Sequence, residues 1–298
     1  MDFSGIYPAL TTPFASDGEV DLQALRQNVS RYNQTAVSGY VVLGSTGESV
    51  MLSATEGEAI LTAVRDSAAP GKRMIAGTGA ESTAETIRKT KKAASLGYEA
   101  ALVKTPYYYK PFYKAEAMIA HYRAVADSSP IPVLLYNIPQ FTGIALETPE
   151  ILTLSKHPNI LGIKDSSGDV RRLSEVVGGA HGEFQVFTGS ASVVFPSLMM
   201  GARGAILALA AALPEACAAL YRLFLQKRLD EARQLQSRLL LASKIIVSEA
   251  GIPGVKHAMD LCGYYGGPPR LPLQPVSEGS RKKIGDTLAA LETSAARA

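Results

Sequence analysis

Residues 160 to 169 read "ILGIKDSSGD", and this stretch contains the unit from which the fold can be inferred. It begins with a short apolar run that shows no polar face, which is typical of a strand covered by helices on both sides. The run ends at Lys164, and acidic, hydroxyl and glycine residues follow directly. A lysine in this place is either a charge that reaches out to water or a buried nucleophile.

Similar short runs recur along the chain and alternate with segments suited to helices, such as residues 81–97, which begin with polar residues and end at Gly97. Eight strands, each followed by a helix, within about 225 residues predict a (β/α)8 TIM barrel rather than an open sheet. We expect residues 1–225 to form this barrel and carry the active site, and residues 226–298 to form an appended C-terminal helical region packed on it. The predicted strands are residues 6–12, 39–43, 73–77, 100–104, 132–136, 160–164, 184–188 and 204–208.

The composition is that of a soluble globular protein with a large core, since 47% of the 298 residues are hydrophobic and 19% are charged. A net charge of +3 is too small to indicate a nucleic-acid groove. The two cysteines, Cys217 and Cys262, lack the spacing of a zinc site or a disulfide framework. We therefore expect a reducing compartment and a cytoplasmic location, and the N-terminal residues show no secretory signal.

The longest apolar run, residues 204–225, has the length of a membrane span. Pro214 and Glu215 interrupt it at a place where a helix could begin, because proline is favoured in the first turn. We predict a buried strand followed by an amphipathic helix.

Polar residues follow several predicted strands. Active sites of such barrels lie at the carboxyl ends of the strands. Here those ends carry "GSTGE" (44–48), "TPYYY" (105–109), "YNIP" (136–139) and Lys164. Four polar groups that converge on one face of an apolar barrel predict a pocket.

Lys164 is the candidate nucleophile. A primary amine attacks a ketone to form a Schiff base only when it is uncharged, and an ordinary lysine with a pKa of about 10.4 is almost fully charged at neutral pH. Burial disfavours the cation, and each unit by which it lowers a lysine pKa gives about a tenfold gain in reactive amine. The alternative is a lysine that only reaches the rim of the barrel.

The other candidates each have a second interpretation. Ser45 and Thr46 suit a small carboxylate, with hydroxyls and backbone N–H groups, but such residues also fill ordinary turns. Tyr136 could relay protons or could be an aromatic core residue. The tyrosines at 107–109 suit loop packing or an oligomer contact.

Several other chemistries are not supported. The four histidines, at 121, 157, 181 and 257, are dispersed without metal-ligand spacing, so we expect no metal. The sequence contains no GxSxG elbow, and neither "GSTGE" nor "GTGAEST" fits a P-loop or a dinucleotide fingerprint.

With these residues assembled, the sequence resembles the dihydrodipicolinate synthase and N-acetylneuraminate lyase superfamily of Schiff-base-forming pyruvate aldolases. The likeness runs over nearly the whole chain, and the order and spacing of its motifs are highly specific. It is carried by "GIYPALTTPF", "GSTGE", "TPYYY", "YNIP" and "GIKDSSGD".

The resemblance implies roles for individual residues. Lys164 would form an imine with pyruvate, without a metal or other cofactor, and Tyr136 would shuttle protons. Ser45 and Thr46 would hold the carboxylate of pyruvate. Tyr108 matches a family tyrosine that reaches across a dimer interface into the neighbouring site, within a homotetramer built as a dimer of dimers. Backbone groups near Gly189 and Ile206 match positions that line the pyruvate pocket.

The branch of the superfamily depends on the second substrate. In the synthases that use aspartate semialdehyde, an arginine follows the "YN(V/I)P" motif, whereas Phe141 stands here and cannot bind a carboxylate by charge. Ala191 and Ser192 replace the acidic pair of the sialic acid lyases. Several segments of the sequence are most similar to the 4-hydroxy-2-oxoglutarate aldolase branch, among them "AGTGAEST", "HYRAVADSSPIPVLLYNIP" and "GIPGVKHAMDLCGYYGGPPRLPLQ".

We therefore expect a class I aldolase that cleaves 4-hydroxy-2-oxoglutarate to pyruvate and glyoxylate, with Ser166 contacting the distal end of the substrate. One alternative is a 4-hydroxy-tetrahydrodipicolinate synthase that tolerates Phe141. An alternative of another class is a non-catalytic barrel that binds a keto acid.

Overall fold

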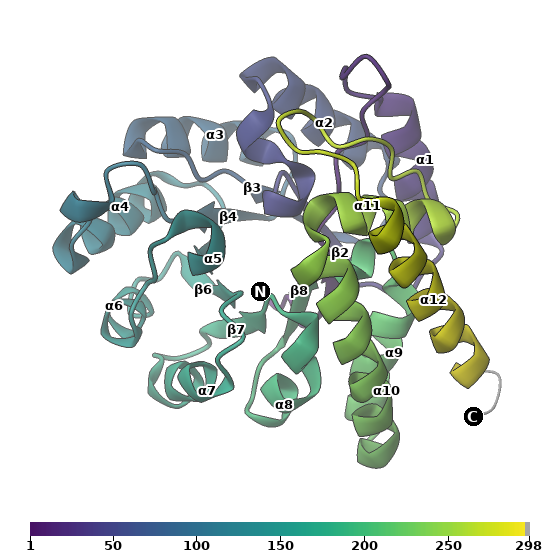
Figure 1. The fold of residues 1–298 in the computed structure, drawn as a ribbon. Coiled ribbons are helices and arrows are strands. Elements are labelled where there is room, and N and C mark those ends of the chain that lie inside the picture. Colours follow the sequence, from purple (N-terminus) through teal and green to yellow (C-terminus); the bar gives the residue numbers. More distant parts are fainter. Residues whose placement is uncertain (296–298) are drawn as a thin grey trace.

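The computed structural model describes residues 1–295, and in this part of the chain eight parallel strands form a single sheet that curls into a barrel (Figure 1). Neighbours in the sheet follow the order β1-β8-β7-β6-β5-β4-β3-β2, so from β2 to β8 each strand pairs with the next in sequence, and β8 pairs with β1. This confirms the predicted (β/α)8 TIM barrel. The strands are β1 Gly5–Pro8, β2 Gly39–Val42, β3 Arg73–Gly77, β4 Ala100–Lys104, β5 Val133–Asn137, β6 Ile160–Asp165, β7 Gln185–Thr188 and β8 Gly204–Leu207.

The barrel is nearly closed between β1 and β2. No ladder joins these two strands, but Ala9 forms an isolated parallel bridge with Val41. The backbone N–H of Leu10 also donates to the carbonyl of Val41, over 2.9 Å. The prediction of a first strand over 6–12 was wrong in length. After Pro8 the chain leaves its ladder with β8 and turns toward β2.

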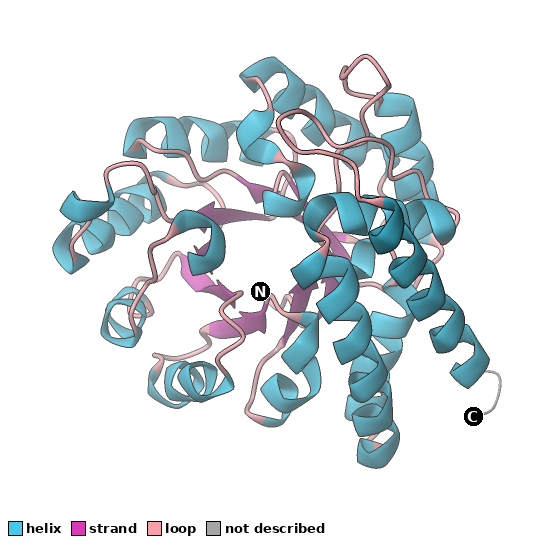
Figure 2. Cartoon of the chain, viewed as in Figure 1, coloured by secondary structure: helices cyan, strands magenta, loops and turns pink. Residues whose placement is uncertain are grey.

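Helices surround the barrel, as Figure 2 shows in cyan around the magenta strands. Side-chain caps fix several of their starts: Asp21 caps α1, Ser82 caps α3, and Ser53 forms a capping box with Glu56 at α2. The helices between the strands are α1 Leu22–Asn33, α2 Ala54–Ser67, α3 Thr83–Ser95, α4 Ala115–Ser128, α5 Pro139–Thr142, α6 Thr148–Leu154, α7 Val170–Gly179 and α8 Val194–Met199.

The predicted strand and helix in residues 204–225 are confirmed as β8 and α9 (Pro214–Leu225), with Pro214 in the first turn. No described helix is long and apolar enough to cross a membrane. The C-terminal helices are α10 Leu229–Ala242, a π-helical turn Ser243–Glu249, α11 Gly251–Leu261 and α12 Glu278–Ala295. Of these helices, α10 lies beside α9 and packs on it, and α12 packs on both α10 and α11 (Figure 1). The last three residues of the predicted region, 296–298, lie outside the described residues.

Alternation along the strands divides their side chains between two layers. On β5, Leu134 and Tyr136 belong to the cluster that fills the barrel, together with Phe187 and Ile206. Val133 and Leu135 belong to the cluster shared with the outer helices. Because both layers are apolar, these strands lack a polar face, as their sequence indicates.

Candidate active site

Lys164 and Tyr136 lie side by side at the carboxyl ends of neighbouring strands. Tyr136 of β5 pairs in register with Lys164 of β6, so both side chains emerge on the inner face of the barrel. Nζ of Lys164 lies 4.1 Å from the centroid of the Tyr136 ring, a cation–π distance. Only 4% of Lys164 is exposed, so its amine does not reach the water as a snorkelling lysine would.

Ser45 completes this group from β2. The "GSTGE" residues include a short 3₁₀ turn, Ser45–Gly47, separated from the end of β2 by two residues. The hydroxyl oxygens of Ser45 and Tyr136 are 3.5 Å apart, and either can donate. Thr12, in the segment after β1, fixes the turn, because its hydroxyl donates to the carbonyl of Gly47 over 2.6 Å. Thr46 is buried in the same turn. The geometry therefore places a hydroxyl pair, Ser45 and Tyr136, next to a buried amine.

Gly189 packs closely against Lys164. Its backbone N–H donates to the carbonyl of Asp165 over 2.6 Å. A Cβ built on Gly189 would lie 1.9 Å from Oγ of Ser166 and 3.0 Å from Cε of Lys164. The structure thus brings Gly189 and Ser166 to Lys164, and Ile206 is fully buried in the same inner cluster as Tyr136.

Two predicted residues lie at the surface of this single chain. Tyr108 is 73% exposed, with its backbone N–H bonded to the carboxylate of Glu81 and its ring edge-on to Tyr109. Phe141 is 62% exposed on the short helix α5, which begins three residues after Tyr136. The structure therefore does not bring these two aromatic rings into the buried group around Lys164.

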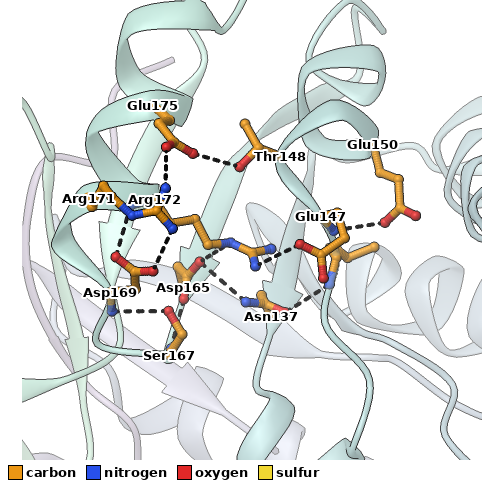
Figure 3. A network of polar contacts seen from close by, with 11 residues as sticks. Asn137, Glu147, Thr148, Glu150, Asp165, Ser167, Asp169, Arg171, Arg172 and Glu175 are labelled. Atoms are coloured by element: carbon orange, nitrogen blue, oxygen red, sulfur yellow. Dashed lines mark hydrogen bonds and ion pairs between the residues drawn. The ribbon is translucent and has the colours of Figure 1, made fainter.

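Behind the candidate site lies a polar network that the sequence analysis missed (Figure 3). Asn137 and Asp165 follow Tyr136 and Lys164 by one residue, so their side chains point away from the barrel interior. The amide Nδ2 of Asn137 donates to Oδ2 of Asp165 over 3.2 Å, and Nε of Arg172 lies 3.4 Å from the same oxygen. The two strands that carry the inner pair are thus tied together on their outer side.

Lys104 is a second lysine near the mouth of the barrel and was also missed. It ends β4 and donates from Nζ to the carbonyl of Gly79 over 3.0 Å. Burial lowers the pKa of Lys104, while the Glu81 carboxylate opposes this shift. Lys104 borders a small hollow that also touches Ser45 and Tyr136.

A larger hollow than the one beside Ser45 and Tyr136 does not touch Lys164. It lies outside the barrel interior, between the loops after β2 and β3 and the helices α2 and α3, and Lys104 forms part of its wall. The buried amine and the hydroxyl pair, rather than the size of a hollow, mark the candidate active site.

The described residues contain no group of three or more histidine, cysteine or acidic side chains that could hold a metal ion. The dispersed histidines agree with this finding. His121 bonds to Thr83, and His157 bonds to Asp127 on the outside of the barrel.

Comparison with known proteins gives close relatives over nearly the whole chain. Residues 2–291 match the dihydrodipicolinate synthetase family. A 4-hydroxy-tetrahydrodipicolinate synthase from Methanothrix thermoacetophila is 37% identical over 288 residues, which cover 96% of each chain. The solved synthase from Methylacidiphilum fumariolicum is 32% identical and covers 99% of this chain and 98% of its own, with a TM-score of 0.93. The synthase from Acinetobacter baumannii, solved with pyruvate, is 32% identical over 97% of this chain and 98% of its own, with a TM-score of 0.92.

These relatives correct the expected activity. The preference for a 4-hydroxy-2-oxoglutarate aldolase is wrong, because the similar curated proteins, at 35–38% identity, are 4-hydroxy-tetrahydrodipicolinate synthases. The preference depended on sequence similarity in segments such as residues 251–274, which form α11 and the segment after it. These residues lie outside the strands that carry Lys164 and Tyr136. Likeness there reports how the chain packs and not which second substrate it takes.

Proposed function

Because the chain belongs to the dihydrodipicolinate synthetase family, and is a lyase of the pyruvate-dependent aldolase type, we propose that it is a 4-hydroxy-tetrahydrodipicolinate synthase that condenses pyruvate with aspartate semialdehyde. One observation carries the chemistry: the buried amine of Lys164 lies against Tyr136, and the hydroxyl of Tyr136 lies 3.5 Å from that of Ser45. A nucleophile next to a hydroxyl pair suits a reaction that forms an imine and then moves protons.

In the proposed reaction Lys164 attacks the keto carbon of pyruvate, and loss of water gives a protonated imine. The imine draws electrons from the methyl carbon, which loses a proton and becomes an enamine. The enamine carbon then attacks the aldehyde carbon of the second substrate, whose oxygen takes up a proton. Finally the amino group of that substrate attacks the imine carbon and displaces Lys164. The imine is the electron sink, so the steps require no metal.

Tyr136 and Ser45 supply the proton transfers in this scheme. The amine of Lys164 lies over the ring of Tyr136, whose hydroxyl can pass its own proton to Ser45 as it takes the proton from the methyl carbon, and can later return a proton to the aldehyde oxygen. Ser45 connects the phenol to the "GSTGE" turn. In this proposal Thr46 and the backbone of the turn hold the pyruvate carboxylate, and Gly189 and Ile206 line the pocket around its small body.

The carboxylate of aspartate semialdehyde requires a binding group near Ser166 and α5. Phe141 occupies the place where an arginine was expected, and a phenyl ring offers neither charge nor hydrogen bonds. We assign this role to Ser166, whose backbone carbonyl is already held by the side-chain amide of Gln140 over 3.1 Å. A single hydroxyl binds a carboxylate more weakly than a guanidinium does, so the proposal implies a high KM for aspartate semialdehyde.

We further propose that Tyr108 enters the site of a second copy, within a homotetramer built as a dimer of dimers. Exposed aromatic rings gather in its loop, which supports an interface at this place. These rings belong to Tyr108, Tyr109 and Phe112.

Reduction with borohydride in the presence of pyruvate, followed by intact mass, tests the nucleophile. We expect one pyruvyl adduct on the wild type and none on Lys164→Ala. Lys104→Ala is the matched control, since it removes the other amine near the barrel mouth and should keep the adduct. An adduct that survives in Lys164→Ala, or disappears in Lys104→Ala, contradicts the assignment.

The second substrate is tested with the wild type, by following the consumption of pyruvate and the formation of the cyclic product when aspartate semialdehyde is added. We expect turnover only with both substrates present. An enzyme that forms the adduct but gives no condensation product would keep the Schiff-base chemistry and refute the synthase.

A further inference from the structure

Glu48, the last residue of the "GSTGE" motif, is almost completely buried, with 1% of its surface exposed. Its φ of 54° lies in the left-handed region, which non-glycine residues adopt only at a cost. Its backbone N–H donates to the carbonyl of Ser45 over 3.1 Å and closes the short turn. The conformation of Glu48 therefore bears directly on the residue that faces Tyr136.

The carboxylate of Glu48 is held by a lysine from the C-terminal region. Nζ of Lys256, on α11, lies 2.6 Å from Oε1 of Glu48, and Lys256 is also 1% exposed. The same ammonium donates to the carbonyl of Pro268 over 2.8 Å and lies 4.4 Å from the centroid of the Phe14 ring. Burial lowers the pKa of Lys256, and the Glu48 carboxylate opposes this shift. Each charge thus has its partner inside the protein.

The segment after α11 holds the second oxygen. The backbone N–H of Arg270 donates to Oε2 of Glu48 over 2.9 Å. The guanidinium of Arg270 pairs with Glu56 on α2 and donates to the carbonyls of Gly18 and Met51. The residue whose backbone holds Glu48 is therefore itself fixed to the barrel side of the structure through its side chain.

We propose that the C-terminal region is a working part of the active site, in which Lys256 and the backbone of Arg270 hold Glu48 and thereby keep Ser45 against Tyr136. Glu48 and Lys256 are positioning residues, because they act through Ser45 and lie outside the group that meets the substrate. This proposal rests on the proposed function, because it assumes that Ser45 and Tyr136 relay protons. It gives residues 251–274 a role in positioning the active site, although none of them contacts the substrate in the proposed reaction.

The geometry favours positioning over a merely structural ion pair. The backbone N–H of Glu48 donates to the carbonyl of Ser45, and this hydrogen bond closes the three-residue turn Ser45–Gly47. Loss of the carboxylate contacts would free Glu48 to leave its left-handed conformation, and the turn would relax with it. If the ion pair were only structural, its loss would lower stability but would leave the distance between the Ser45 and Tyr136 hydroxyls unchanged.

Two measurements on the full-length protein separate imine formation from proton transfer. Borohydride trapping with pyruvate reports the imine on Lys164. Exchange of the methyl hydrogens of pyruvate for deuterium in D₂O, followed by NMR without a second substrate, reports the proton relay. For Glu48→Gln we expect trapping within about twofold of the wild type and exchange slowed by about tenfold or more, since small displacements of a proton-transfer group are costly.

The double variant Glu48→Gln with Lys256→Met tests whether the effect is only one of stability. It removes the unpaired charge that Glu48→Gln leaves buried, so resistance to unfolding should recover. Exchange should stay slow, because the hold on the turn remains lost. Glu99→Gln is the control: it breaks the Arg73–Glu99 ion pair at the amino ends of the strands, which has no bond to the turn or to Arg270, and its exchange rate should match the wild type.

Exchange that recovers together with stability, or that does not fall in Glu48→Gln, would overturn the proposal. Wild-type protein that traps pyruvate but shows no exchange would overturn it as well. If exchange behaves as expected and condensation with aspartate semialdehyde fails, only the proposed second substrate is refuted.

Discussion

Gly189→Ala tests how closely the pocket must fit around Lys164. A methyl group at this position would lie 1.9 Å from Oγ of Ser166 and 3.0 Å from Cε of Lys164. Ordinary contacts between such atoms are about 3.5–4.0 Å, so the hydroxyl must rotate away and the lysine stem must shift by several tenths of an ångström or more. We expect a loss of stability of about 1–3 kcal/mol from overpacking. A displacement near 1 Å at the nucleophile costs about 100-fold in rate, or about 2.7 kcal/mol.

The assay is the rate of adduct formation with pyruvate and borohydride, together with KM for pyruvate and unfolding in urea. Ser166→Gly combined with Gly189→Ala removes the closest contact and leaves the one to Lys164, so the double-mutant cycle assigns the loss to each contact. Gly178→Ala on α7 is the control: nothing lies within 4 Å of the added methyl, and a helical alanine should raise stability by about 0.5–1 kcal/mol. Adduct formation at the wild-type rate in Gly189→Ala would refute the close fit.

Two further substitutions address the two ends of the site. Phe141→Arg should lower KM for aspartate semialdehyde by about tenfold, through a charged hydrogen bond worth about 1.5–3 kcal/mol, and should leave KM for pyruvate unchanged. Steady-state kinetics with each substrate varied measures both KM values. If neither value changes, the assigned binding region is wrong. Asp165→Asn should cost about 3 kcal/mol in urea unfolding, because it removes the buried carboxylate beside the mostly buried Arg172 and leaves only the exposed Glu147 as its partner. Most of this loss should return in Asp165→Asn with Arg172→Met, and an additive loss would show that the pair is not coupled.

The sequence predicts the barrel well because all eight strands are buried on both faces. An apolar run between turn residues locates such a strand within one or two residues, as for the predicted 160–164 and the observed Ile160–Asp165. The first strand is the exception. The sequence run continues past Pro8, but the hydrogen bonds of Ala9 and Leu10 are divided between Leu207 and Val41 on different strands. Contacts of this kind depend on tertiary structure and leave no local pattern.

The inner half of the site follows from the same reasoning. Lys164 and Tyr136 stand at the ends of adjacent parallel strands, and a parallel register makes such residues neighbours. Their partners on the outer side, Asn137 and Asp165, could have been inferred from alternation, since a polar residue directly after an inward-facing one must bond behind the sheet. Lys104 ends a predicted strand in the same way as Lys164, and only the structure shows which amine lies inside the barrel.

The error about the second substrate has a physical explanation in the C-terminal segment. Residues 251–274 supply Lys256 and Arg270, which hold Glu48 in the "GSTGE" turn, and Arg270 lies 222 residues after Glu48 in the sequence. A segment that supports the pyruvate end of the site is constrained by a step that all pyruvate-dependent members would share. Likeness there cannot distinguish between second substrates. That choice depends on the few residues near Phe141 and Ser166, where a single change from arginine to phenylalanine alters the charge offered to the incoming carboxylate.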